Sequence, residues 1–406
     1  MQESKPRAYA YRWLVMGIFM LINIVIQIHW VAFAPITGEA AAYYQVTPLS
    51  IGLLSMIYMF VYIVMCIPAS YVIDTYGVRI GIGIGAALAG VCGFLKGIYA
   101  SNYLMVCVSQ VGLALAQPFI LNAYTKLAAR WFPLNERATV SGLASLAQYL
   151  GIIVALGLTP YLVNAYRIEG MLMGYGIISL AAAIVFIALM RERPPTPPGA
   201  EEEGERFRVF EGLGFLLGRR DMRLLLVLFF IGLGIFNAVT TWIEQILAPR
   251  GINAEQAGLI GALMMVGGVI GASVLPPLSD KLRRRRPFLV AAMFFVVPGL
   301  FGLSFAESLP LLLASGFVLG FFIMSAGPIG FQYGAEVSYP APESISQGVI
   351  LLSGQISGII FIFGMDVFRS AQGSMTPFMI AFMALSTVNV ALCLLLRESD
   401  MMKKSG

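Results

Sequence analysis

Apolar runs of about 20 residues or more recur along this chain, and they limit its fold more than any other feature. A helix of roughly 20 apolar residues spans the hydrocarbon core of a bilayer. Since 59% of the 406 residues are hydrophobic and only 12% are charged, the chain is too apolar for an ordinary soluble domain. The runs lack the two-residue alternation of outer-membrane barrel strands, and backbone groups in lipid must be paired within their segment, so helices are predicted.

Twelve such runs fall into two groups of six. The predicted spans are 11–36, 49–73, 78–98, 103–130, 138–163 and 170–190 in the first group, and 222–248, 255–277, 287–306, 309–337, 343–368 and 377–396 in the second. We therefore expect an all-α membrane protein with twelve transmembrane helices in two pseudo-symmetric six-helix bundles.

The stretch between the two groups is polar, charged and rich in proline, starting at Arg191-Glu-Arg-Pro-Pro. It predicts an N-terminal bundle at 1–190, a cytoplasmic linker at 191–221 and a C-terminal bundle at 222–406. Part of the linker, from Arg206 to Arg220, forms either a short amphipathic helix on the inner leaflet or a disordered connector that leads into the next span.

Positive charge is distributed unevenly between the two predicted sides of the membrane. If the N-terminus is cytoplasmic, all but four of the 26 lysines and arginines lie on that side, the exceptions being Lys96, Arg167, Arg250 and Arg369. Such asymmetry orients multi-pass proteins, so the chain is predicted to lie in the cell membrane, inner or plasma, with both termini in the cytoplasm. The Arg283–Arg286 run fits a topology determinant that contacts anionic lipid, and no nucleic-acid partner is expected.

The two groups also show signs of an internal duplication. Gly52 precedes Asp74 by 22 residues, and Gly258 precedes Asp280 by the same 22, which gives an offset of 206. A second set has equal spacing at an offset of 207: Pro133, Glu136 and Gln148 against Pro340, Glu343 and Gln355. Two landmarks at nearly one offset indicate the parallel-repeat architecture of many secondary transporters, with Gln148 and Gln355 as pseudo-symmetric partners.

Polar side chains form stripes on three predicted helices. The stripes are Asn23, Gln27 and Trp30 on the first helix, Gln110, Gln117 and Tyr124 on the fourth, and Asn237, Thr241 and Glu244 on the seventh. The spacing is i, i+4 and i+7 on the first and seventh helices and seven residues on the fourth, so each set shares one face of its helix. Because polar groups are costly in lipid, these stripes either hydrogen-bond to neighbouring helices or line a central cavity.

The chemistry of the expected cavity is neutral. The candidate substrate-binding residues are Gln27, Trp30, Gln117, Gln148, Asn237, Thr241 and Gln355. They offer one indole together with uncharged donors and acceptors, and no Lys, Arg or Asp falls near the middle of these helices. This set suits a small zwitterion, amine or polar neutral molecule better than an anion, which would need a basic clamp.

Five further residues are candidates for gating or coupling. His29, the single histidine, has either a hydrogen-bonded packing role or a role in gating and pH sensing. Glu244 either carries a coupling proton or marks the extracytoplasmic boundary of its helix. Asp74, Arg79 and Asp280 lie in the two duplicated loops and are expected to form gating contacts.

The loop that holds Asp74, Gly77 and Arg79 resembles the signature between helices 2 and 3 of the major facilitator superfamily. Ser70 stands where a glycine is usual and Val78 where a basic residue is usual, so a weaker ionic latch is expected. Within that superfamily, several stretches resemble the feline leukaemia virus subgroup C receptor family, which includes choline and ethanolamine transporters. They are Tyr11-Arg-Trp, His29-Trp30, Ser55-Met-Ile-Tyr-Met, Pro68-Ala-Ser, Asp74-Thr-Tyr-Gly, Lys126-Leu-Ala-Ala-Arg-Trp-Phe and Gln148-Tyr-Leu-Gly.

The resemblance implies the major facilitator fold and a site that encloses a quaternary ammonium. In that family the cation lies between a tryptophan on helix 1 and a tyrosine on helix 7, and glutamines on helices 5 and 11 contact the substrate. Trp30, Gln148 and Gln355 match these positions, whereas Asn237 stands where the tyrosine is expected. A second aromatic face contributes roughly 0.5–2 kcal/mol to cation binding, so its replacement favours a substrate with hydrogen-bonding groups.

These observations favour a facilitator that moves a small amine-like, zwitterionic or polar neutral solute by alternating access. A proton-coupled antiporter that exports amphipathic compounds is one alternative, and a non-transporting membrane receptor is another. No nucleophile, base and orienting group occur at a recognisable spacing, and no metal-ligand or cofactor motif occurs, so an enzyme is not expected. The expected partners are the solute and the lipid bilayer, with the monomer as the functional form.

Overall fold

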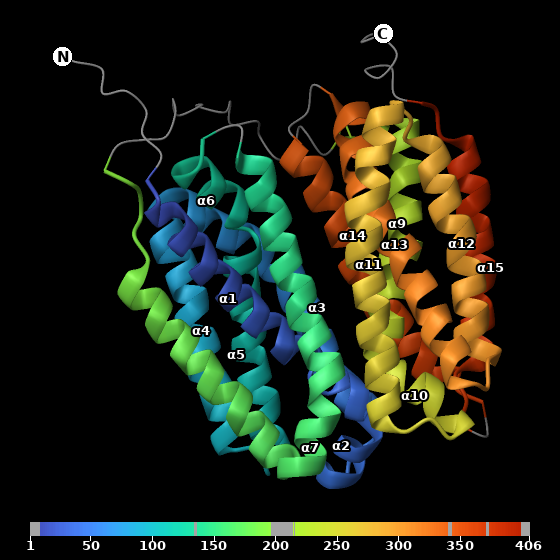
Figure 1. Ribbon diagram of the computed structural model, residues 1–406, viewed down its shortest axis with the longest axis horizontal. Helices are drawn as coiled ribbons and strands as arrows, with labels where there is room; N and C mark the ends of the chain where they lie inside the picture. Colours follow the sequence, from blue (N-terminus) through green and yellow to red (C-terminus); the bar gives the residue numbers. More distant parts are fainter. Residues whose placement is uncertain are drawn as a thin grey trace. The chain divides into compact units, whose positions relative to one another are not determined.

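The computed structural model describes residues 9–133, 136–195, 214, 216–339, 343–370 and 373–398. The chain divides into two compact units, Met1–Gly204 and Glu205–Gly406, coloured blue to green and yellow-green to red in Figure 1. Eleven helices in the described ranges are long and apolar enough to cross a membrane. The predicted linker helix at 206–220 lies outside the described residues except for its C-terminal end.

The first unit is built from long helices joined by short connections. They are α1 (Tyr11–Val31), α3 (Pro48–Tyr76), α4 (Val78–Ile98), α5 (Tyr103–Leu121), α6 (Tyr124–Trp131) and α7 (Arg137–Leu189). The short η1 (Ala34–Ile36) and α2 (Thr37–Tyr44) connect α1 to α3. The fifth and sixth predicted spans both lie in α7, which turns at Arg167, where φ is 60° and ψ is 178°.

In the second unit, α9 (Arg220–Thr241) is followed by the short α10 (Ile243–Leu247) and η3 (Ala248–Arg250). Its remaining helices are α11 (Ala254–Leu282), α12 (Arg286–Phe305), α13 (Leu309–Ser338), α14 (Glu343–Val367) and α15 (Thr376–Leu395). Three predicted spans are interrupted: those at 11–36, 103–130 and 222–248 each continue into a separate short helix.

Local sequence explains where several helices start. The Thr47 hydroxyl accepts a hydrogen bond from the Ser50 N–H at 3.3 Å, and Pro48 follows at the first helical position of α3. Asn253 and Gln256 form a reciprocal capping box at the start of α11. These side chains satisfy backbone N–H groups that have no partner within the helix.

Within each unit, the helices pack at close range. In the first unit α7 packs against α1 and α4, and in the second α13 packs against α11 and α12. Gly320 of α13 lies so near α11 that a Cβ there would clash with the Met264 carbonyl. Small residues of this kind allow helices to approach closely in lipid, where apolar burial alone does not drive association.

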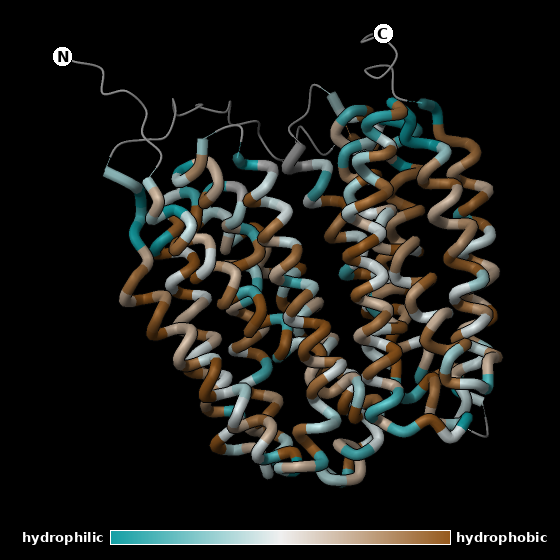
Figure 2. The backbone as a smooth tube through the Cα atoms, viewed as in Figure 1, coloured by the Kyte–Doolittle hydropathy of each residue, from teal (hydrophilic) through white to brown (hydrophobic). Residues whose placement is uncertain are grey.

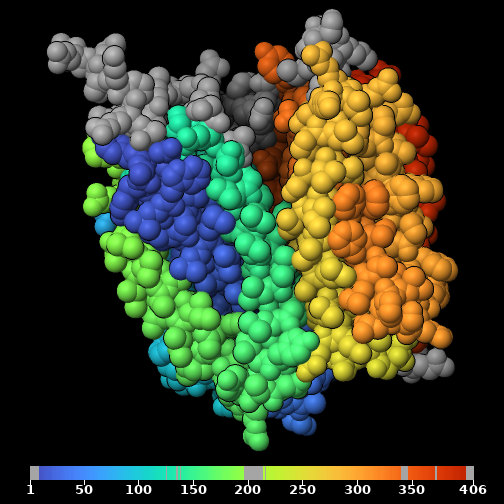
Figure 3. All heavy atoms as spheres, viewed as in Figure 1, coloured from blue at the N-terminus to red at the C-terminus, as the bar shows by residue number. Residues whose placement is uncertain are grey.

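The outer surface of each unit is apolar along the length of its helices. Large side chains such as Val64, Phe294 and Phe301 are 71%, 57% and 58% exposed. In Figure 2, the polar colour gathers at the helix ends, and the brown of apolar residues covers much of their length. Figure 3 shows α11, α12 and α13 forming one face of the second unit. Exposed apolar surface of this extent fits a lipid-facing exterior.

Candidate functional site

Trp30 lies in the last turn of α1, where its indole is 9% exposed. Its backbone carbonyl accepts a hydrogen bond from the Ser55 hydroxyl at 3.1 Å, which ties α1 to α3. The indole Nε1 is buried and hydrogen-bonds to no group in the described part of the chain. Because an unpaired buried donor costs free energy, this position combines an apolar ring with an unused N–H.

Three glutamine side chains of the first unit also make no hydrogen bond to another described group. Gln27 on α1 is 3% exposed and Gln117 on α5 is 8% exposed, while Gln148 on α7 is half-buried. Gly151 brings α7 against the α1 backbone beside Gln27, since a Cβ there would lie 2.7 Å from the Gln27 Cβ. These side chains could each donate and accept hydrogen bonds with a bound solute.

Gln110 has a different role from Gln117, although both lie on α5 in the same predicted stripe. Its Nε2 donates to the carbonyls of His29 at 3.2 Å and Leu54 at 3.0 Å, and its Oε1 accepts from the Lys96 ammonium at 2.6 Å. Gln110 therefore joins α1, α3, α4 and α5. For this residue the structure supports the helix-to-helix alternative, because contacts with neighbouring helices use its hydrogen-bonding groups.

Lys96, expected near the extracytoplasmic water, is fully buried at the end of α4. Its Nζ lies 5.0 Å from the centre of the Phe33 ring in addition to its hydrogen bond with Gln110. An aromatic face and an amide oxygen partly compensate a buried ammonium. Lys96 lies near the end of its helix, as the predicted span 78–98 implies. Nothing in the sequence pattern indicated that its side chain is buried.

His29 contacts other groups of the first unit rather than an open space. Its ring is 1% exposed, and Nε2 lies 2.7 Å from the Ser179 hydroxyl on α7. The ring also meets Tyr175 edge-on at 6.3 Å between centroids. This geometry supports the packing alternative for His29.

In the second unit, Asn237 and Gln355 lie on neighbouring helices. The Asn237 Nδ2 donates to the Gly354 carbonyl at 3.3 Å, directly before Gln355 on α14. This bond orients the amide and leaves its Oδ1 without a hydrogen bond in the described ranges. Gln355 is half-buried, and the buried Thr241 hydroxyl has no partner among the described groups.

Glu244 lies in α10, just after α9 ends, and is half-buried. It accepts a hydrogen bond from the Gln245 side chain at 2.5 Å, and Gln245 in turn accepts one from Arg369 at 3.0 Å. Nearby, Arg250 donates to the Ala306 carbonyl at 2.9 Å, and burial lowers the pKa of its guanidinium. Glu244 thus belongs to a polar cluster at the end of the helix.

The loop residues of the first unit form exposed and half-buried ion pairs. Asp74 lies 3.3 Å from the Lys126 ammonium, and its side chain is 73% exposed. Glu192, which follows α7, accepts hydrogen bonds from the backbone N–H groups of Val78 at 3.2 Å and Arg79 at 2.7 Å. Its carboxylate also pairs with Arg130. The exposed Arg79 therefore contributes its backbone to this network.

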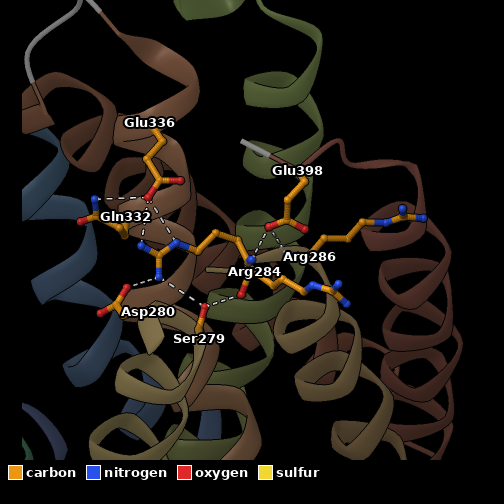
Figure 4. A network of polar contacts seen from close by, with 8 residues as sticks. Ser279, Asp280, Arg284, Arg286, Gln332, Glu336 and Glu398 are labelled. Carbon is orange, nitrogen blue, oxygen red and sulfur yellow. Dashed lines mark hydrogen bonds and ion pairs between the residues drawn. The ribbon is translucent and has the colours of Figure 1, made fainter. Parts of the chain in front are cut away.

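The corresponding network of the second unit centres on Arg285, which is 3% exposed (Figure 4). Its guanidinium pairs with Asp280 and, at 3.0 Å, with Glu336, whose side chain is 6% exposed. The Glu398 carboxylate accepts hydrogen bonds from the backbone N–H groups of Arg285 and Arg286. Asp280 thus makes the kind of ionic contact predicted for the loop, but its partner is a neighbour in the arginine run.

Glu192 and Glu398 are functional candidates that the sequence reasoning missed. They differ by 206 positions, the offset already given by Asp74 and Asp280, and each caps the start of the helix after its duplicated loop. A search at that offset beyond the loops would have found them. In the described part of the chain, no three His, Cys, Asp or Glu side chains gather to hold a metal ion.

Comparison with known protein families identifies the family of this chain. A model of the Major Facilitator Superfamily matches residues 14–362. The chain belongs to this superfamily. Its helical units and duplicated loops are therefore those of a multi-pass membrane transporter, and the predicted all-α major facilitator fold is confirmed.

Individual relatives show which branch of the superfamily this chain is similar to. Solute carrier family 49 member A3 of Xenopus tropicalis is 32% identical over 376 residues, which cover 88% of this chain and 77% of that protein. Choline/ethanolamine transporter FLVCR1 of Mus musculus is 28% identical over 400 residues, covering 90% of this chain and 70% of that protein. The chain is thus an FLVCR-like member of the superfamily, as its sequence stretches indicated.

Solved structures share the fold at low identity. A bacterial homolog of the human lysosomal transporter Spinster superposes with a TM-score of 0.76 at 14% identity, covering 98% of this chain and 99% of that one. The nucleoside transporter NupG gives a TM-score of 0.70 at 12% identity, covering 94% and 99%. These likenesses concern the fold alone.

Proposed function

We propose that this transporter moves a small amine-like, zwitterionic or polar neutral solute of the choline and ethanolamine type, by facilitated alternating access. The observation that carries the proposal is the set of polar side chains in each unit that hydrogen-bond to no described protein group. In the first unit this set includes the buried Trp30 Nε1. Relatives at 26–28% identity are named choline/ethanolamine transporters.

The second unit favours ethanolamine over choline. Asn237 holds its nitrogen on the Gly354 carbonyl at 3.3 Å, which leaves an amide oxygen as the group it can offer. A primary ammonium donates three hydrogen bonds to such acceptors, whereas a quaternary ammonium donates none. With one indole and no second aromatic residue at the position of Asn237, the cation–π contribution is smaller than in a two-ring cage.

We further propose that the chain lies in a cell membrane with both termini cytoplasmic and acts as a monomer. The orientation is supported by the distribution of lysine and arginine, because cytoplasmic loops carry an excess of these residues. In this orientation, the arginine run of the second unit is cytoplasmic. Lys126 and Arg130 of the first unit are cytoplasmic as well.

Transport by the purified chain in liposomes tests this function. We expect ethanolamine uptake down its gradient, inhibition by excess unlabelled ethanolamine, and weaker uptake of choline. Trp30→Ala should reduce uptake at least tenfold, while Trp13→Ala, which removes a 44% exposed indole from the same helix, should not. Absence of uptake for every solute that binds the protein would instead support the receptor alternative.

A pH gradient across the same liposomes separates a facilitator from a proton-coupled antiporter. A facilitator equilibrates ethanolamine with or without the gradient, and Glu244→Gln leaves that equilibration unchanged. Gradient-driven accumulation that disappears in Glu244→Gln would overturn the facilitative mechanism in favour of proton coupling.

A further inference from the structure

The start of α12 and the end of α15 enclose a groove with a volume of about 830 Å³ in the second unit. Its lining combines two kinds of side chain. Arg283, Arg284 and Arg286 form a basic rim, and Phe294, Phe295 and Leu394 belong to its apolar part. The groove therefore lies where two membrane-spanning helices reach the level of the lipid headgroups.

The apolar part of the groove is open to the surroundings. Phe294, Phe295 and Leu394 are 57%, 41% and 51% exposed. These residues lie two to three turns into α12 and in the last turn of α15, within the membrane-spanning lengths of both helices. Their exposed faces can contact an acyl chain.

The basic rim has side chains directed away from the buried network. Figure 4 shows Arg284 and Arg286 extending to the side opposite Asp280 and Glu336. The Arg285 guanidinium instead pairs with those two carboxylates. Arg284 is exposed and Arg286 half-buried. The Arg286 guanidinium also donates to the Leu394 carbonyl, which holds it over the groove.

The carboxylate that lines the same groove does not cancel this positive charge. Glu398 accepts hydrogen bonds from the N–H groups of Arg285 and Arg286. Its negative charge is thereby directed at the start of α12, where a carboxylate is stabilised by the helix dipole. Two guanidinium groups, those of Arg284 and Arg286, line the groove against this one carboxylate.

The fold itself does not require these arginines. At the repeat offset of 206, Arg283, Arg284 and Arg286 correspond to Gly77, Val78 and Ile80, which begin α4 in the first unit. The capping carboxylates Glu192 and Glu398 are present in both units. The same helix start thus forms without the basic rim, so the rim needs an explanation beyond local structure.

We propose that this groove binds one anionic phospholipid, with its phosphate on Arg284 and Arg286 and an acyl chain along Phe294, Phe295 and Leu394. Guanidinium groups match phosphate in geometry as well as charge. The charge of the rim and the apolar length of the groove together select a charged lipid over a zwitterionic one. The site differs from the solute-binding residues and does not depend on the proposed substrate.

Lipid retention by the purified full-length chain tests the proposal. The protein is exchanged into micelles that contain equal amounts of dioleoyl phosphatidylglycerol and dioleoyl phosphatidylcholine, and native mass spectrometry records the lipid retained. We expect one phosphatidylglycerol per chain in wild type. Arg284→Gln combined with Arg286→Gln should lower the phosphatidylglycerol preference about 30-fold, because each arginine near an anionic surface contributes roughly a factor of five.

Matched variants separate this site from general charge effects. Lys281→Gln combined with Arg220→Gln removes the same charge from exposed positions of the second unit outside the groove, and it should keep the preference. Phe294→Ala should weaken retention of both lipids. Equal retention of the two lipids by wild type, or an unchanged preference in the double arginine variant, would overturn the proposal. Equal thermal stabilisation by soluble glycerol phosphate would also overturn it, because the apolar part would then be unused.

Discussion

The two units place a carboxylate at the same repeat position, but they surround it with different charges. Glu192 in the first unit accepts hydrogen bonds from N–H groups at the start of α4, and Glu398 in the second accepts them from N–H groups at the start of α12. Beside them, position 130 of the first unit is an arginine and the equivalent position 336 of the second is a glutamate. The cap is common to both units, but the charge beside it is reversed: Arg130 pairs with the capping Glu192, whereas Glu336 pairs with Arg285.

Burial makes this reversal matter for stability. Arg130 and Glu192 have side chains that are 30% and 31% exposed, whereas Arg285 and Glu336 are 4% and 6% exposed. A half-exposed pair is screened by water, and a buried pair is not. The comparison shows that the duplicated backbone geometry is retained while each unit has its own charge network.

The largest expected effect is the removal of the buried carboxylate. Glu336→Gln leaves Arg285 with the exposed Asp280 as its remaining described ion-pair partner, and breaking a buried pair in this way costs about 3 kcal/mol. Thermal unfolding in detergent should show the loss. The equivalent change in the first unit, Arg130→Gln, should cost less than about 1 kcal/mol. Equal losses would show that burial does not distinguish the two networks.

The next largest effect on stability is expected for Gln110 of α5, and little effect is expected for Gln117 of the same helix. Gln110→Leu removes the amide that bonds Lys96 and two backbone carbonyls, and unsatisfied buried groups cost about 1–3 kcal/mol each. The melting temperature should fall clearly. Gln117→Leu on the same face should leave it nearly unchanged and reduce ethanolamine uptake. The reverse pattern would contradict the assignment of structural and binding roles.

The shared cap should give similar and smaller effects in both units. Glu192→Gln and Glu398→Gln each weaken hydrogen bonds to helix-start N–H groups and an interaction with the helix dipole, at a cost of about 1 kcal/mol. Glu192→Gln also removes the half-exposed pair with Arg130, which adds less than about 1 kcal/mol. Unfolding of each variant measures this cost. A strongly unequal cost would break the equivalence of the two positions.

The smallest effect is expected at the duplicated loop of the first unit. Asp74→Asn removes the charge from a side chain that is 73% exposed, so its cost should stay below about 0.5 kcal/mol. Unfolding under the same conditions provides the check. A loss as large as that of Glu336→Gln would mean that the Asp74 pair is much less screened than its exposure indicates.

The helical architecture could be predicted from the sequence because backbone N–H and C=O groups in lipid must be hydrogen-bonded within their own segment. Spans such as 78–98 and 309–337 match α4 and α13 to within one residue. Interruptions were missed where a short second helix follows a bend, as after Thr241, because hydropathy continues across the bend. The turn inside α7 was predicted, since Arg167 falls in the gap between the spans 138–163 and 170–190, although its positive φ without a glycine was not.

The division of polar residues into structural and binding roles could not be predicted from spacing. Gln110 and Gln117 share a face seven residues apart, and only the carbonyls of α1 and α3 decide that Gln110 is fully bonded. Lys96 offered no pattern that signals burial. In contrast, Glu398 could have been found from the repeat offset, because the same carboxylate occurs at Glu192.

The most direct test of the account is ethanolamine binding to Gln148→Leu, Gln355→Leu and the double variant, measured by titration calorimetry on purified protein. Each single change should weaken binding about fivefold, because each removes an amide that we propose hydrogen-bonds to the solute, and a hydrogen bond contributes roughly 1 kcal/mol. The double variant should bind more weakly than either. Unchanged affinity in both single variants, with the fold intact, would contradict the account.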